Sequence, residues 1–236
     1  GPRRRCSNRL RPPKRFSSSR AVDVIGDYHK QGFAHLSGLI SAEVARAFMN
    51  TLKEEIAPGP IPLSQVAEHP AVLRRPAYEA EGFAWKPISF FHWGLTPITS
   101  ELIGRDIVPS YSYFRIYREG DVCFVHSDRP ASQHGISLTL DYSDGVVWDL
   151  EVARDPTDTL YPLSKDFGDD DYSSVSMEVG DALVYQGSRY AHGRMKPNPN
   201  AWSAHLFMFW VDRDGPYRDH AFDGKVKLGA VNFSFF

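Results

Sequence analysis

The sequence has little cysteine, no long apolar run and almost no net charge, and each of these features argues against a class of protein. Only Cys6 and Cys123 occur among the 236 residues, so a disulfide framework is not expected and a reducing, cytoplasmic setting fits the composition. No apolar run approaches the roughly 20 residues that a membrane helix needs. A formal charge of −2 at pH 7 argues against attraction of nucleic acid to the whole surface.

Acidic residues are absent from residues 1–20, where eight residues are Arg or Lys. Such a segment cannot bury a core, so we expect a disordered basic arm. A solvated arm is the favoured interpretation, and an anion-binding segment or a transit peptide are the alternatives. The whole chain is 42% apolar and 13% aromatic, which is enough to give residues 21–236 the core of one domain.

Residues 20–56 predict two helices around one short strand. We expect a short helix over residues 20–30 and a strand over residues 32–36. Ser41 is a good N-cap for the second helix. Apolar residues then recur at a spacing of four, which predicts a helix with one buried face: Val44, Phe48, Leu52 and Ile56.

The remaining chain divides at Pro109. Before it, residues 57–96 show no clear period and are expected to form a covering loop, followed by a short helix over residues 97–104. After it, segments rich in β-branched and aromatic residues alternate with turn formers. These segments predict strands over residues 111–118, 121–128, 135–142, 146–153, 174–179, 181–186 and 202–212. The pattern predicts a mainly β fold with flanking helices, a sandwich or jelly roll.

The motif His126-Ser127-Asp128 lies at the end of one predicted strand. Residues two apart in a strand point to the same face, so the imidazole and the carboxylate can bind one ion. His192 follows a turn, an apolar strand and a second turn, and a jelly roll can bring it opposite the motif. Two imidazoles and one carboxylate form the facial triad of non-haem Fe(II) oxygenases, which leaves open positions on the metal. The alternative is that all three residues are ordinary polar groups.

Two segments around this motif resemble the metal-binding strands of 2-oxoglutarate- and Fe(II)-dependent dioxygenases. They are residues 113–130 and residues 180–187 with His192 after them, and the opening at residues 31–41 is also similar to that of many members. The resemblance spans roughly residues 23–213 in order and spacing. It implies a double-stranded β-helix, Fe(II) and 2-oxoglutarate as cofactors, and oxidation by O₂ with release of succinate. Hydroxylation is the commonest outcome in the family.

The sequence departs from the family pattern after the second histidine. Many members have an Arg or Lys there that binds the far carboxylate of 2-oxoglutarate, whereas residues 201–204 are Ala-Trp-Ser-Ala. Another residue must bind this carboxylate, or the co-substrate is a different acid. Arg194 is the first choice, because it shares a face with His192 if the strand continues. Arg115 and Tyr117, which share a face of an earlier strand, are the other candidates, and a surface cation or a sheet-face pair are the alternatives.

Several further residues have two interpretations. Arg129 directly follows the motif and is interpreted as a contact to a substrate anion or as a rim ion pair. His134 and His205 are interpreted as satisfied structural histidines. Three tryptophans are interpreted as core residues, and the alternative is that they line a substrate site: Trp85, Trp93 and Trp148.

The sequence therefore predicts an oxygenase that hydroxylates a small molecule with Fe(II) and 2-oxoglutarate. A cupin-like metal oxygenase without 2-oxoglutarate and a non-catalytic jelly-roll binding module are the alternatives. A protein or nucleic-acid substrate stays open because of the basic arm, but is not favoured.

Overall fold

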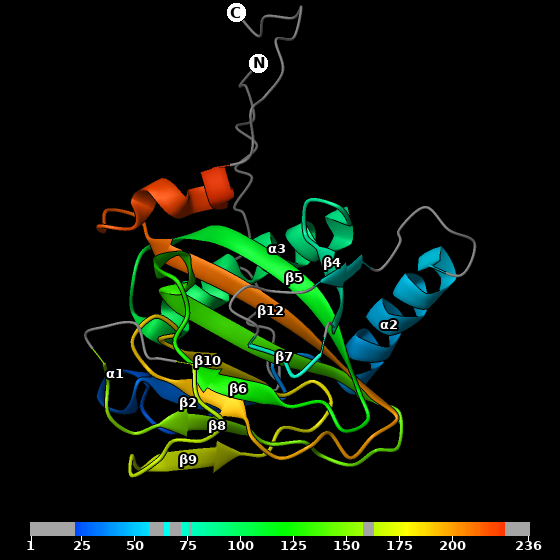
Figure 1. Ribbon diagram of the computed structural model, residues 1–236. Helices are drawn as coiled ribbons and strands as arrows, with labels where there is room; N and C mark the ends of the chain where they lie inside the picture. Colours follow the sequence, from blue (N-terminus) through cyan, green and yellow to red (C-terminus); the bar gives the residue numbers. More distant parts are fainter. Residues whose placement is uncertain (1–21, 57–63, 67–71, 76, 158–162, 225–236) are drawn as a thin grey trace, which may run out of the picture.

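Two antiparallel sheets form the body of the protein, and helices cover the outer face of the larger one (Figure 1). The computed structural model describes residues 22–56, 64–66, 72–75, 77–157 and 163–224. The predicted basic arm, residues 1–20, lies outside the described residues. None of the described helices combines the length and the apolarity that crossing a bilayer requires.

The larger sheet has eight strands in the order β1-β2-β10-β7-β12-β5-β4-β3, and the smaller sheet has four in the order β6-β11-β8-β9. The larger sheet contains β1 (Asp23–Ile25), β2 (Phe33–Ser37), β3 (Ser64–Val66), β4 (Ala77–Glu81), β5 (Ile107–Arg118), β7 (His134–Tyr142), β10 (Ala182–Tyr185) and β12 (Trp202–Asp212). The smaller sheet contains β6 (Cys123–His126), β8 (Leu150–Ala153), β9 (Tyr172–Val175) and β11 (His192–Arg194). The helices are α1 (Tyr28–Gln31), α2 (Ala42–Ile56) and α3 (Lys86–Ile103), with 3-10 turns η1 (Pro130–Ser132) and η2 (Arg218–Gly224). The predicted mainly β architecture with flanking helices is confirmed.

The two faces of the larger sheet have different chemistry, because alternate side chains of a strand point to opposite faces. On β12, Leu206 and Met208 belong to the apolar core with residues of α2 and α3. Phe207 and Phe209 belong to a second cluster that includes residues of the smaller sheet. The face of β12 that carries Phe207 and Phe209 is therefore the one that lines the interior between the two sheets. Buried polar side chains also lie on this face.

The first predicted helix is mostly wrong. Residues 23–25 form β1, which pairs with β2, and only Tyr28–Gln31 is helical. The β-branched pair Val24-Ile25 favours a strand, and Gly26 has a φ of 103° that a helix does not allow. Asp27 then caps the short helix by accepting hydrogen bonds from the backbone N–H groups of His29 and Lys30.

The helix after Ser41 is confirmed, but its buried face is rotated from the predicted one. The Ser41 hydroxyl accepts a hydrogen bond from the Val44 N–H at 3.3 Å. The Val44 side chain is 46% exposed. A spacing of four residues drifts by about 40° per step around a helix of 3.6 residues per turn, so it cannot stay on one face. The buried positions instead combine steps of three and four: Ala45, Met49 and Leu52, with Phe48 partly buried. The side chain of Ile56 lies outside the described residues.

The predicted loop over residues 57–96 is wrong where the chain is described, because it contains β4 and the first half of α3. The helix begins at Lys86 with Pro87 in its first turn, a position where the missing N–H has no cost. The predicted start at Pro97 lies inside the helix. His92 fixes this helix to the sheet, because its Nε2–H donates to the Phe209 carbonyl at 2.8 Å.

Candidate metal centre and the adjoining interior

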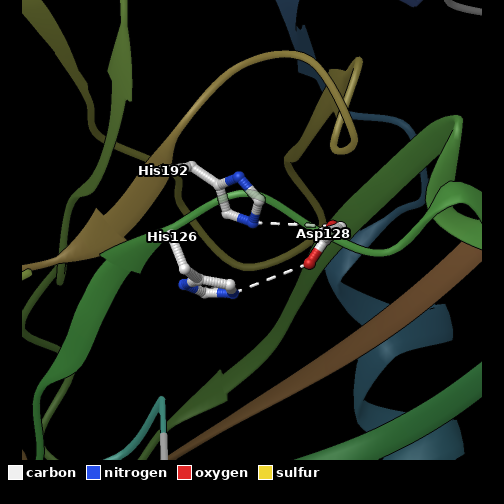
Figure 2. A group of neighbouring side chains, drawn as sticks. All are labelled: His126, Asp128 and His192. Carbon is white, nitrogen blue, oxygen red and sulfur yellow. Dashed lines mark ion pairs between the residues drawn. The ribbon is translucent and has the colours of Figure 1, made fainter. Parts of the chain in front are cut away.

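The three predicted metal ligands lie together at one end of the interior, as Figure 2 shows. His126 ends β6 and His192 begins β11, and the two residues are direct partners in the smaller sheet. Asp128 follows β6 and points at both rings. His126 Nε2 lies 3.6 Å from Asp128 Oδ1, and His192 Nε2 lies 3.6 Å from Asp128 Oδ2. Potential ligand atoms of the three residues lie within 4.8 Å of one another.

Hydrogen bonds to the backbone set the orientation of both imidazoles. His126 Nδ1 lies 2.7 Å from the Phe124 carbonyl, and His192 Nδ1 lies 3.0 Å from the Tyr190 carbonyl. A carbonyl oxygen only accepts, so each Nδ1 carries the hydrogen and each Nε2 presents a lone pair to the site. Metal-binding histidines are fixed in this way.

The surroundings of Asp128 suit a cation. Its Oδ2 is buried and has no hydrogen-bond partner among the described residues. Gly187 makes room for this oxygen, since a Cβ at Gly187 would lie 2.3 Å from it. Burial raises the pKa of the Asp128 carboxyl, but the His192 and His126 imidazoles outweigh this effect and hold it below its usual value. Burial lowers the pKa of His192. A carboxylate and neutral imidazoles are the protonation states that bind a divalent metal, so the residues fit one.

Arg115 and Tyr117 lie side by side on the inner face of β5, as their spacing predicts. Both are buried, and Arg115 Nη1 donates to the Tyr117 hydroxyl at 3.3 Å. Arg115 also forms an ion pair with Glu79, its neighbour on β4. The charge of Arg115 is therefore compensated by a carboxylate of the same sheet.

Arg194 enters the interior from the smaller sheet. Its side chain is only 1% exposed, and its guanidinium stacks 4.7 Å from the Trp148 ring centre. It donates to the Trp148 carbonyl and approaches His205 Nδ1 at 3.5 Å. No carboxylate of the described residues forms an ion pair with it. Arg194 thus differs from Arg115 in having no direct ion pair among the described residues, although it lies close enough to the buried Glu151 carboxylate of β8 to lower the pKa of that group.

The other predicted residues fall in three settings. Arg129 is exposed, and its guanidinium lies 4.0 Å from the Tyr111 ring centre. Trp148 faces the interior beside Arg194. Trp85 belongs to the core under the helices, and Trp93 is exposed on α3.

The two strand histidines differ in their partners. His134 is a satisfied structural histidine, as predicted, with Tyr28 at Nδ1 and Asp212 at Nε2. His205 is not, because its Nε2 has no hydrogen-bond partner among the described residues.

Three further buried polar side chains of the interior were missed from the sequence: Ser137, Thr139 and Ser203. Ser137 and Thr139 alternate with large apolar residues in Ile136-Ser137-Leu138-Thr139-Leu140, and Ser203 lies between Trp202 and Ala204. That alternation places polar groups on the inner face, and it is the pattern from which they could have been found.

No protein-family model matches the sequence, and no curated protein matches it. Similarity appears in solved structures. The carbocyclase SnoK from nogalamycin biosynthesis, described as non-haem and α-ketoglutarate dependent, is 14% identical with a TM-score of 0.61, over 79% of this chain and 82% of SnoK. HygX from Streptomyces hygroscopicus, solved with nickel and 2-oxoglutarate, is 13% identical with a TM-score of 0.58, over 79% of this chain and 85% of HygX.

A prolyl-4-hydroxylase from Pseudomonas putida is a third such structure. It is 14% identical, with a TM-score of 0.52, over 79% of this chain and 96% of the hydroxylase. Identities this low establish the fold alone. The chain has the fold of 2-oxoglutarate-dependent oxygenases, the double-stranded β-helix that the sequence resemblance implies.

Proposed function

We propose that the protein is an Fe(II)- and 2-oxoglutarate-dependent oxygenase that acts on a small molecule. The observation that supports this most directly is the triad of His126, Asp128 and His192, in which two fixed Nε2 atoms lie beside a buried carboxylate oxygen that accepts no hydrogen bond from the described part of the chain. The fold agrees, because HygX has been solved with iron and with nickel and 2-oxoglutarate.

The three side chains would hold the metal through His126 Nε2, His192 Nε2 and the Asp128 carboxylate. Bound Fe(II) would supply the redox chemistry, with three coordination positions left for a 2-oxo acid and O₂. The protein keeps the ligands in place: Tyr185 packs against the His192 ring at 4.8 Å between centres, and Gly187 leaves space for Asp128. Fixed ligands favour one coordination geometry over others.

Hydroxylation is the outcome that we propose, although the fold also serves other oxidations. SnoK is a carbocyclase and SnoN is an epimerase. A small-molecule substrate is in keeping with HygX, which has been solved with hygromycin B. In this chain Arg129 is the exposed cation that follows the metal-binding motif directly, and we propose that it contacts an anionic group of the substrate. Mass spectrometry of the products distinguishes these outcomes, because hydroxylation adds one oxygen atom, oxidative ring closure removes two hydrogens and epimerisation leaves the mass unchanged.

The proposal is tested by metal binding and by uncoupled turnover together. The wild-type protein should bind Ni(II) in calorimetry and form succinate from 2-oxoglutarate with Fe(II) and ascorbate. Asp128→Ala and His126→Ala should lose both properties while unfolding cooperatively. His29→Ala, which changes an exposed histidine of α1, should retain both. If the wild-type protein does neither, or if Asp128→Ala does both, the proposed function is wrong.

A further inference from the structure

Four buried polar side chains on the inner face of the larger sheet have an atom without a hydrogen-bond partner among the described residues. They are Ser137, Thr139, Ser203 and His205, and each is 0% exposed. Leaving a buried donor or acceptor unpaired destabilises the folded state. Four such groups on one face therefore destabilise the ligand-free fold, and they indicate a ligand that completes their hydrogen bonds.

The four residues adjoin one another in the register of the sheet. Thr139 on β7 and Arg115 on β5 are the direct cross-strand partners of His205 on β12. Side chains so paired have Cβ atoms about 4.5–5.5 Å apart. Ser137 and Ser203 are each two residues away from a member of this row and share its face. His205 is thus the centre of the group.

Arg194 sets the tautomer of His205. A guanidinium only donates hydrogen bonds, so His205 Nδ1, 3.5 Å from Arg194 Nη2, is the acceptor. The hydrogen of the neutral ring is then on Nε2, the atom that has no partner. Burial lowers the pKa of His205 well below its usual value, and the neighbouring cations Arg194 and Arg115 lower it further. His205 therefore presents an uncharged N–H donor.

Two buried guanidinium groups meet at the same place. Arg194 has no direct ion pair among the described residues and shares only a longer-range attraction with the Glu151 carboxylate of β8, whereas Arg115 is paired directly with Glu79. A buried charge without a direct partner destabilises the folded state. Water alone would satisfy the hydroxyls of Thr139 and Ser137 but would not neutralise the guanidinium. An anion with several acceptor sites does both, and a carboxylate offers about four lone pairs.

The group around His205 adjoins the strand that carries a metal ligand. Arg194, which approaches His205 Nδ1 at 3.5 Å, follows His192 by two residues on β11. An acid held by the triad at one end would therefore need a second acceptor group at its other end to contact His205.

We propose that His205 Nε2–H and the Thr139 hydroxyl bind the far carboxylate of the acid co-substrate, and that Arg194 is a positioning residue that fixes the His205 tautomer and balances the charge. This inference rests on the proposed function. In this arrangement a neutral imidazole next to a buried arginine takes the place of the Arg or Lys that is absent from residues 201–204. The group selects 2-oxo dicarboxylic acids over 2-oxo monocarboxylic acids.

The test compares two acids on the full chain loaded with Ni(II). Calorimetry would measure the dissociation constants of 2-oxoglutarate and of 2-oxopentanoate, which has the same chain length but lacks the far carboxylate. The wild-type protein should prefer 2-oxoglutarate. His205→Leu should reduce that preference about 10- to 100-fold, with its affinity for 2-oxopentanoate nearly unchanged. His205→Gln, whose amide can donate from a similar position, should recover part of it. Thr139→Val should show a smaller loss of the same kind.

The outcomes separate this inference from the proposed function. Equal binding of both acids by the wild-type protein would refute the carboxylate site but not the metal centre. If His205→Leu and Thr139→Val both prefer 2-oxoglutarate over 2-oxopentanoate as strongly as the wild type does, other residues bind the carboxylate. No binding of either acid to Ni(II)-loaded protein, together with no succinate formation, would overturn the proposed function and the inference with it.

Discussion

Two buried histidines on neighbouring strands show how the same residue type serves stability in one place and ligand binding in another. His134 on β7 uses both ring nitrogens within the protein, with Tyr28 at 2.6 Å and Asp212 at 3.0 Å. His205 on β12 uses only Nδ1, and its Nε2 has no partner among the described residues. A satisfied buried group stabilises the fold, whereas an unsatisfied one destabilises it until a ligand binds. The difference predicts opposite consequences when each is replaced.

Replacing His134 should have the largest effect on stability. His134→Leu leaves the Tyr28 hydroxyl without its acceptor and removes one of the hydrogen bonds of Asp212, so we expect a loss of about 2–4 kcal/mol in the free energy of unfolding. His205→Leu removes the unsatisfied Nε2 donor and also the long contact of 3.5 Å from Arg194 to Nδ1. These effects oppose each other, so we expect the free energy of unfolding of the ligand-free protein to change by less than about 1 kcal/mol. Urea unfolding of both variants measures this directly. A comparable loss in the two variants would remove the distinction between them.

The metal-binding histidines His126 and His192 combine a structural role with a ligand-binding role. In each ring Nδ1 donates a hydrogen bond to a backbone carbonyl, and Nε2 faces the metal site. Their partner Asp128 depends on the space at Gly187, where a Cβ would lie 2.3 Å from Oδ2. Gly187→Ala should therefore displace the carboxylate and weaken Ni(II) binding about 10- to 100-fold, as changes next to metal ligands do. Gly94→Ala on α3, at a glycine with no atom near its added Cβ and no positive φ, controls for general effects on the Ni(II) affinity. Unchanged Ni(II) affinity in Gly187→Ala would place Asp128 outside the metal centre.

The protonation of His205 gives a third contrast, in the dependence of stability on pH. Burial, with help from Arg194 and Arg115, depresses the pKa of His205 in the folded protein, while the unfolded chain titrates near the ordinary value of about 6.5. The unfolded state then binds the proton first, so stability is lost as the pH falls below about 6.5, by about 1.4 kcal/mol per unit. His205→Leu should remove this part of the dependence. Unfolding free energies at pH 7 and pH 5.5 in EDTA, wild type against variant, would reveal it, and identical slopes would contradict it.

The sequence predicted what depends on local spacing and missed what depends on pairing across the fold. The triad followed from the spacing of His126 and Asp128 on a strand, and the strand over residues 202–212 has the predicted bounds. The start of α3 was missed because Pro97 was interpreted as a boundary, although the apolar contacts of the helix continue on both sides of it. His205 was interpreted as satisfied, because the absence of a partner for Nε2 is fixed by cross-strand register and not by its neighbours in sequence.

The smallest expected effect concerns two buried threonines that repeat the contrast between the histidines. Thr99 on α3 donates to the Leu95 carbonyl at 2.8 Å, whereas the Thr139 hydroxyl has no partner among the described residues, and both are 0% exposed. Valine has nearly the shape of threonine without the hydroxyl. Thr99→Val should cost about 1 kcal/mol, one ordinary hydrogen bond, while Thr139→Val should be neutral or stabilise the ligand-free protein by up to about 1 kcal/mol.

In the presence of Ni(II) and a saturating concentration of 2-oxoglutarate, the order of stability between Thr139→Val and the wild type should be reversed. A ligand that binds the folded protein stabilises it in proportion to its affinity, so a variant that binds the acid more weakly gains less from it. The melting temperature of Thr139→Val should therefore be equal to or above that of the wild type without ligand and below it with ligand. Thr99→Val should lie below the wild type by the same amount in both conditions. If Thr139→Val is destabilised without ligand as much as Thr99→Val, the Thr139 hydroxyl stabilises the ligand-free fold and is not a carboxylate-binding group.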